Sequence, residues 1–161
     1  MFTIRAGYND SFEVDAPIEK VRRFFSDVRN FVELMPNVES INLIEETIAR
    51  WTIRAEIPFI GSVSQSFNVE LSENTDNRIE WIPKSGETQN FLRYGADFIG
   101  KSAERTLIQF SQMVELRRKA AREFHLLAGL AGEKRVSQGM QAEVAGMIKK
   151  FVQRTKERLE K

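Results

Sequence analysis

Hydrophobic and polar residues alternate along much of the chain between residues 38 and 115. In the clearest stretch, the hydrophobic positions are Trp51, Ile53, Ala55, Ile57 and Phe59, with polar residues or proline between them. Such alternation is typical of a half-buried antiparallel strand. Further strands are predicted at 63–71, 78–82, 90–99 and 105–115, separated by short turns. Because the connections are too short for parallel crossovers, the pattern predicts an antiparallel meander.

The segment before the meander predicts one strand and two short helices. Residues 2–14 contain scattered β formers around a break at 7–10, which suggests an irregular or edge strand. A helix is expected to begin near Asp15 and Pro17, with Asp15 as a candidate cap. The second short helix should end at Met35, because the residue before Pro36 is disfavoured in a helix.

After Glu115 the hydrophobic period becomes helical again. Residues 116–131 predict a penultimate helix that ends near the glycines at 129 and 132. Ser137 is a candidate cap for a terminal amphipathic helix. That helix should span about 23 residues, or roughly 35 Å, which is long enough to cross the whole sheet.

The composition indicates one globular domain over residues 1–161 and limits its chemistry. The chain has 161 residues, of which 42% are hydrophobic and 29% are charged. It has no cysteine and one histidine, His125, so disulfides, thiolate nucleophiles and zinc sites are not expected. We therefore predict no metal and no cofactor.

Charge is distributed unevenly along the chain. Residues 117–161 contain twelve Lys/Arg and five Asp/Glu, although the whole chain has a net charge of only +1. The basic region is either a solvated helix face or a surface that attracts an anionic membrane or an acidic partner protein. Nucleic-acid binding is not expected, since aromatic residues do not interleave with the basic ones. With neither a leader-like start nor an apolar run of bilayer length, we expect a cytoplasmic protein.

Several local sequences resemble a known superfamily. The segment 12–21 reads FEVDAPIEKV and is followed by FFSD at 24–27, which resembles the opening of polyketide cyclase/dehydrase-like proteins. The sequence MPNV at 35–38 resembles the start of their second strand, and the similarity continues through Trp51 and the sequence RIEW at 78–81. Together with the element order, these motifs resemble the START-like or SRPBCC superfamily, which includes the birch-pollen-allergen-like proteins. Within it, the chain is most similar to the branch that contains the G-subunit-like proteins of carbon monoxide dehydrogenase and the coenzyme Q-binding proteins.

The resemblance implies an α+β helix-grip fold, in which a curved antiparallel sheet of six to seven strands wraps around the long C-terminal helix. Two short helices follow strand 1. It also implies that a hydrophobic or amphipathic small molecule binds between sheet and helix, in a cavity walled by large aromatics, methionines and a few polar groups. The predicted cavity residues are Trp51, Ile53, Gln65, Phe67, Val69, Trp81, Leu92, Tyr94, Phe110, Gln112, Met140, Val144, Met147 and Phe151.

Four polar residues are candidates for recognition. Tyr94 either donates to a ligand oxygen or bonds within the protein, and alternation places its neighbour Arg93 on the opposite face. Gln65 and Gln112 either orient a ligand carbonyl or bond to each other or to trapped water. His125 has no sequence-visible catalytic partner. Isolated strand carboxylates, at Glu80, Asp97 and Glu115, are interpreted as exposed charge.

Three classes of function remain open from the sequence. The leading one is a non-enzymatic carrier or sensor of a lipid, isoprenoid quinone or polyketide-like ring. The second is a cyclase or dehydratase in which Tyr94, Gln65 or His125 polarises a carbonyl, with no catalytic residue assigned by motif. The third is an assembly or chaperone-like module that docks through basic residues such as Lys149 and Lys150. The apolar segment 126–132 is either a lid, a membrane-touching tip or a buried turn between helices.

Overall fold

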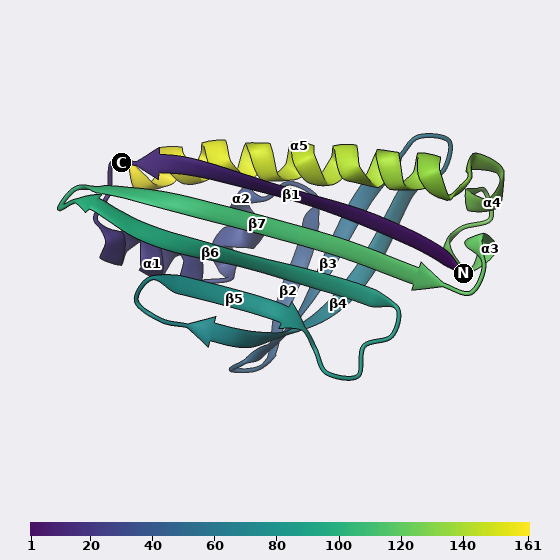
Figure 1. Ribbon diagram of the computed structural model, residues 1–161, viewed down its shortest axis with the longest axis horizontal. Helices are drawn as coiled ribbons and strands as arrows, with labels where there is room; N and C mark the ends of the chain where they lie inside the picture. The colour runs from purple at the N-terminus through teal and green to yellow at the C-terminus, as the bar shows by residue number, and fades with distance from the viewer.

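A single antiparallel sheet of seven strands is the largest part of the fold. The computed structural model describes residues 1–161, and its strands follow the order β1-β7-β6-β5-β4-β3-β2, with every neighbouring pair antiparallel (Figure 1). The strands are β1 (Phe2–Val14), β2 (Val38–Glu45), β3 (Ile48–Ile57), β4 (Gly61–Asn74), β5 (Arg78–Pro83), β6 (Asn90–Ser102) and β7 (Arg105–Arg118). Since β1 pairs with β7, the first and last strands lie side by side and the meander is closed at this edge by the N-terminal segment.

The long C-terminal helix packs against the sheet. The helices are α1 (Ile18–Ser26), α2 (Arg29–Leu34), α3 (Ala121–Phe124), α4 (Ala128–Ala131) and α5 (Glu133–Leu159). With 27 residues, α5 is roughly 40 Å long and runs the length of β1 (Figure 1). Figure 1 shows α1 and α2 near the C-terminal end of α5, whereas α3 and α4 lie near its N-terminal end. A seven-stranded antiparallel sheet with this helix and two short helices after β1 is the helix-grip fold.

Side chains of α5 cover the free edge of β1. Gly7 donates its backbone N–H to Gln141 Oε1 at 2.8 Å, and Gln141 Nε2 donates to the Gly7 carbonyl at 2.7 Å. The backbone N–H groups of Thr3 and Asp15 donate to glutamates of α5 or just beyond it, at 3.2 and 2.9 Å. An exposed strand edge is a template for unwanted pairing, so these bonds both protect the edge and fix the helix over it.

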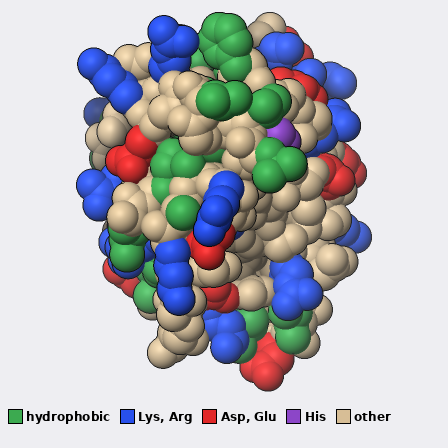
Figure 2. Space-filling view, turned by 90° about the vertical axis from the view of Figure 1, so that its right-hand side faces the viewer, with side chains coloured by type: hydrophobic (Ala, Val, Ile, Leu, Met, Phe, Trp, Pro, Cys, Tyr) green, Lys and Arg blue, Asp and Glu red, His purple; other side chains and the backbone are tan.

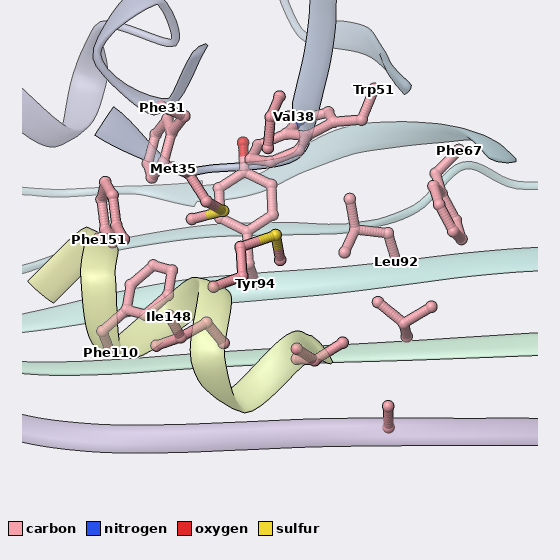
Figure 3. Close-up of a cluster of buried hydrophobic side chains, with 14 of the residues drawn as sticks. Phe31, Met35, Val38, Trp51, Phe67, Leu92, Tyr94, Phe110, Ile148 and Phe151 are labelled. Carbon is pink, nitrogen blue, oxygen red and sulfur yellow. The ribbon is translucent and has the colours of Figure 1, made fainter. Parts of the chain in front are cut away.

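An aromatic cluster joins the C-terminal half of α5 to the sheet. Phe31, Trp51, Tyr94 and Phe151 come from four different elements and point toward one another (Figure 3). The Phe151 ring centroid lies 5.3 Å from those of both Phe31 and Phe110. These rings pack closely between helix and sheet at this end.

The first strand and first helix differ from the prediction in detail. The expected break at 7–10 is absent, because all of β1 pairs with β7 in one unbroken register. Asp15 does not cap α1; its carboxylate instead pairs with Arg105 at 3.2 Å. The carbonyl of Pro17 accepts the first helical bonds, from Lys20 and Val21 at 3.0 and 3.2 Å.

The predicted end of the third strand is also wrong. It ends at Ile57, because Pro58 has no N–H to continue the ladder. Phe59 then adopts a φ of 71° in the hairpin turn and leaves its side chain 75% exposed.

The predicted penultimate helix is wrong as well. Leu116 belongs to β7, which continues to Arg118 because Phe2 of β1 pairs opposite it. Only the single turns α3 and α4 follow, and Gly132, with a φ of 88°, separates α4 from α5. Helix α5 therefore begins at Glu133, one turn before the predicted cap Ser137.

No helix of the protein has a stretch that is both long and apolar enough to cross a bilayer.

Candidate ligand pocket

The sheet is split on the side that faces the N-terminal half of α5. Strand β5 pairs with β4 only from Val69 onward and with β6 only at 94–97. On the sides that face each other, residues 61–68 of β4 and 90–93 of β6 are therefore not paired with any strand. Figure 1 shows β3 and β4 diverging from β6 and β7 at this end. The divergence creates a wedge beneath the helix.

A largely apolar pocket occupies this wedge. Its lining residues are Asn37, Ile53, Arg54, Ala55, Val63, Gln65, Phe67, Val114, Leu116, Met140, Glu143, Val144 and Met147. The free space, including the mouth that opens to solvent, is about 410 Å³, but the interior volume open to a water-sized sphere is only about 20 Å³. That interior volume accommodates about one water molecule. In this conformation the pocket is narrow, a property on which the sequence carries no information.

The pocket contains part of the predicted cavity set. The predicted residues that line it are Ile53, Gln65, Phe67, Met140, Val144 and Met147. The other predicted residues are buried on the same face of the sheet or helix but belong to the packed core beside the pocket, and these are Trp51, Val69, Trp81, Leu92, Tyr94, Phe110, Gln112 and Phe151. Alternation identified the inward face, but it did not show which part of that face is filled by rings from other elements.

Three polar side chains of the neighbouring core lack hydrogen-bond partners. The indole N–H of Trp51, the hydroxyl of Tyr94 and both amide atoms of Gln112 are buried without a partner. Gln112 lies directly opposite Tyr94 across the β6–β7 pair, and the rings of Trp51 and Tyr94 are 4.8 Å apart. Burial raises the pKa of the Tyr94 hydroxyl far above its ordinary value, and a contact with the Trp51 indole N–H, whose geometry falls short of a hydrogen bond, offsets this only in part. The core therefore contains several unused donors, all of them neutral.

A second polar group lies at the pocket wall formed by β4. Gln65 Oε1 accepts from Arg118 Nη2 at 3.1 Å and from Asn90 Nδ2 at 3.2 Å. Arg118 Nη2 also donates to Asn90 Oδ1 at 2.8 Å. These three side chains, which we call the clasp, bridge β4, β6 and β7 across the split in the sheet. Gln65 and Gln112 thus do not bond to each other.

The mouth of the pocket is held by Glu143 of α5. Its Oε2 accepts from the backbone N–H of Glu56 at 3.1 Å and from Asn37 Nδ2 at 3.4 Å. These bonds attach the helix to β3 and to the loop before β2. Widening the mouth requires that they break or lengthen.

The remaining polar candidates lie elsewhere. Arg93 is exposed on the outer face, as alternation predicted. His125 follows α3, and its Nδ1 accepts from the Leu127 backbone N–H at 3.1 Å, away from the pocket lining. The strand carboxylates are not isolated charges: Glu80 and Asp97 pair with Arg78 at 2.9 and 2.8 Å. Glu115 pairs with Arg5 and Arg117, and its pKa is lowered because these hydrogen bonds outweigh its burial.

Sequence reasoning missed Asn90 and Arg118 of the clasp and seven residues of the pocket lining, which are Asn37, Arg54, Ala55, Val63, Val114, Leu116 and Glu143. Arg118 was within reach of the alternation pattern. It follows Gln112, Val114 and Leu116 at alternate positions of β7, so a strand assignment through 118 would have placed it on the inward face. Because residues 116–131 were predicted to be helical, the alternation was not followed as far as Arg118. Asn90 was missed because it stands at a strand end, where alternation carries little information.

The fold and pocket define a START-like, helix-grip protein, and comparison with known proteins supports this class. An aromatase/cyclase from Streptomyces sp. R1128, Zhui, is 14% identical, with a TM-score of 0.70 over 97% of this chain and 94% of that one. A START superfamily protein from Mycobacterium smegmatis is 16% identical, with a TM-score of 0.56 over 86% of this chain and 96% of that one. A protein from Deinococcus radiodurans is 20% identical, with a TM-score of 0.59 over 98% and 97%. At these identities the likeness concerns the fold.

The family is shown by the sequence itself. Residues 11–159 match the profile of the CoxG family, which is described as the G subunit of carbon monoxide dehydrogenase. The chain belongs to this family. A search of curated proteins found no match to the sequence.

Proposed function

We propose that the protein binds and carries a hydrophobic or amphipathic small molecule, such as a lipid, an isoprenoid quinone or a polyketide-like ring. The observation that supports this is the apolar pocket between α5 and the split sheet, lined by Met140, Val144 and Met147 of the helix. Apolar walls with a few placed polar groups are typical of ligand pockets. Removing a few hundred Å² of ligand surface from water would contribute several kcal/mol, at about 25 cal/mol per Å² and before the cost of immobilisation.

Binding requires the pocket to widen. An interior of about 20 Å³ is far smaller than a lipid chain. Methionine side chains are flexible, so Met140 and Met147 are able to repack around an irregular guest. The hydrogen bonds of Glu143 at the mouth would then release, and α5 would move away from β3. The carried molecule would therefore replace the contacts that Glu143 of α5 makes with β3 and with the loop before β2.

Uptake of a neutral dye tests the proposal. N-phenyl-1-naphthylamine fluoresces when it leaves water, and we expect saturable binding by the wild-type protein. Val144→Phe places a ring in the pocket and should abolish binding. Gln153→Phe, at an exposed position of the same helix, should leave binding unchanged. If the protein takes up no dye and native mass spectrometry of the purified protein shows only the bare chain, the carrier proposal is wrong.

An enzymatic role is a second candidate, favoured by the unpartnered hydroxyl of Tyr94. Because burial keeps this group protonated, it is suited to donate a hydrogen bond to a carbonyl that enters the widened pocket. Cyclisation or dehydration of a polyketide-like substrate would use such a donor. The discriminating result is loss of turnover in Tyr94→Phe with unchanged dye binding, whereas equal turnover removes Tyr94 from consideration.

An apolar tip beside the start of α5 favours delivery at a membrane surface. Leu126 and Leu130 are 83% and 86% exposed, which does not fit the alternative of a buried turn. The guanidinium of Arg135 lies 5.8 Å from the ring centroid of exposed Phe59, so apolar and basic groups adjoin here. Figure 2 shows hydrophobic side chains gathered on this end of the molecule, near the single histidine and among basic residues. Apolar anchors with basic neighbours are typical of interfacial membrane binding.

Vesicle sedimentation tests this delivery surface. The protein should co-sediment with vesicles that contain phosphatidylglycerol and much less with pure phosphatidylcholine. Leu126→Ser combined with Leu130→Ser should abolish sedimentation. The matched control is Leu43→Ser with Ile44→Ser, which changes two exposed apolar residues of β2. Equal recovery with both kinds of vesicle, or equal loss in both double variants, would contradict a specific tip.

A further inference from the structure

Arg118 is a buried cation without a carboxylate partner. It is 9% exposed, and it takes part in no ion pair. Its Nη1 donates to the carbonyls of Arg117 and Gln89, at 2.8 and 3.3 Å. Its Nη2 donates to the amide oxygens of Gln65 and Asn90, at 3.1 and 2.8 Å. All four acceptors are neutral, so the positive charge is solvated by dipoles but not balanced.

Arg78, an arginine of the same sheet, has the carboxylate partners that Arg118 lacks. Arg78 is less buried than Arg118, yet it pairs with Glu73, Glu80 and Asp97 at 3.4, 2.9 and 2.8 Å. Burying an unpaired charge is costly, and buried charges in proteins are normally paired. Burial lowers the pKa of the Arg118 guanidinium. The carboxylate of Glu123 partly offsets this through its charge, although the two side chains form no ion pair. Arginine nevertheless stays protonated, so the charge persists.

Gln65 connects this charge to the pocket. A guanidinium only donates hydrogen bonds, so the Gln65 oxygen must face Arg118, where it also accepts from Asn90. The Gln65 amide nitrogen then has no acceptor in the protein, although the residue lines the pocket. The pocket wall at the split therefore presents an unused N–H donor with a positive charge behind it. The walls made by Val114 and Val144 are apolar.

We propose that the clasp receives the anionic head of an amphipathic ligand, specifically the carboxylate of a long-chain acid. The carboxylate accepts from the Gln65 amide and is stabilised by the charge of Arg118, while the chain lies against Val114, Met140 and Val144. This inference rests on the proposed function, because it names the chemical class carried in the same pocket. The rival explanation is that Arg118 serves only to hold β4, β6 and β7 together across the split.

Two ligands that differ only in the head group separate these explanations. Hexadecanoic acid and 1-hexadecanol have equal chain length, and each is used to displace N-phenyl-1-naphthylamine from the pocket. We expect the acid to bind the wild-type protein about tenfold more tightly or better, as hydrogen bonds to charged groups permit. Arg118→Gln should remove this preference and change the affinity for the alcohol by no more than about twofold. Arg93→Gln, at an exposed arginine of β6, should keep the wild-type preference.

Further variants keep the test decisive if Arg118→Gln does not fold. Arg118→Lys retains the charge, so it should keep part of the acid preference. Gln65→Leu removes the donor and should reduce the preference while the alcohol still binds. The inference is overturned if the wild type binds acid and alcohol equally, or if these variants weaken both ligands equally. Failure of the dye, the acid and the alcohol to bind at all would instead refute the proposed function, and the inference with it.

Discussion

Gln112 offers a direct test of the interior's unused polar groups. Its side chain is 2% exposed, and neither amide atom has a hydrogen-bond partner. It lies on the inward face of β7 between Phe110 and Val114, opposite Tyr94 on β6. Leaving a buried polar group unpaired costs about 1 to 3 kcal/mol, because the group loses water and gains nothing in exchange.

Gln112→Leu removes both polar atoms and keeps a side chain of similar shape. We therefore expect the variant to be more stable than the wild type by about 1 to 3 kcal/mol. In a chain of this length each kcal/mol raises the melting temperature by roughly 2 to 4 °C. Most substitutions in a core destabilise, so a gain of this size would be distinctive.

Urea unfolding followed by tryptophan fluorescence measures the change, since Trp51 and Trp81 are both buried. The free energies of unfolding are compared only if wild type and variant show the same dependence of free energy on urea concentration. An unchanged dependence means that the substitution changed stability and did not change the compactness of the denatured state. Gln109→Leu is the matched control. Gln109 lies on the exposed face of the same strand, and its substitution should change stability by less than about 0.5 kcal/mol.

A loss of stability above about 1 kcal/mol in Gln112→Leu would refute this reasoning, because it would mean that the amide has a partner in solution. A gain in stability together with weaker dye binding would identify Gln112 as a residue kept for binding at the expense of stability.

Three more predictions follow from packing and burial. Phe151→Ala should cost about 3 to 5 kcal/mol in urea unfolding, because the ring packs against four other phenylalanines; a loss below about 1 kcal/mol would contradict the packing. Gly139→Ala should destabilise by about 1 to 3 kcal/mol despite its helix propensity, since its Cβ would lie 2.9 Å from Pro58 Cδ. Gly146→Ala in open space on the same helix should instead stabilise by about 0.5 to 1 kcal/mol, and equal thermal shifts in the two variants would be inconsistent with that contact. Burial raises the pKa of the Tyr94 hydroxyl above its ordinary value of 10.0, so the unfolded chain loses this proton at a lower pH than the folded protein does. The stability that depends on this group is therefore complete below about pH 10 and declines as the pH rises above it. Tyr94→Phe should show a smaller decline in urea unfolding across this range, and an identical decline would contradict the shift.

Residues inside the predicted strands followed from the sequence because alternation is a local property. Trp51 and Tyr94 are both buried on the inward face, and Arg93 is exposed on the other, as the period of two requires. The two short helices after the first strand were also predicted, since Met35-Pro36 ends the second by local sterics.

Errors arose where tertiary pairing overrides local pattern. Leu116 has helical spacing to later apolar residues, but pairing with Ile4 of β1 and Asn90 of β6 holds it in a strand. A single-sequence pattern contains no information about the partner strand that supplies those hydrogen bonds.

Residue spacing alone predicted the antiparallel meander, the inward face of the sheet and the apolar stripe of the long helix, whereas the helix-grip arrangement was implied by the resemblance of local motifs to a known superfamily. Where the interior is filled and where it is open depends on contacts between segments that lie far apart in the chain. Aromatic rings from distant segments close one end, whereas the short pairing of β5 opens the sheet at the other. Only the tertiary structure also brought Arg118, Gln65 and Asn90 together, because their meeting depends on three strands far apart in the chain.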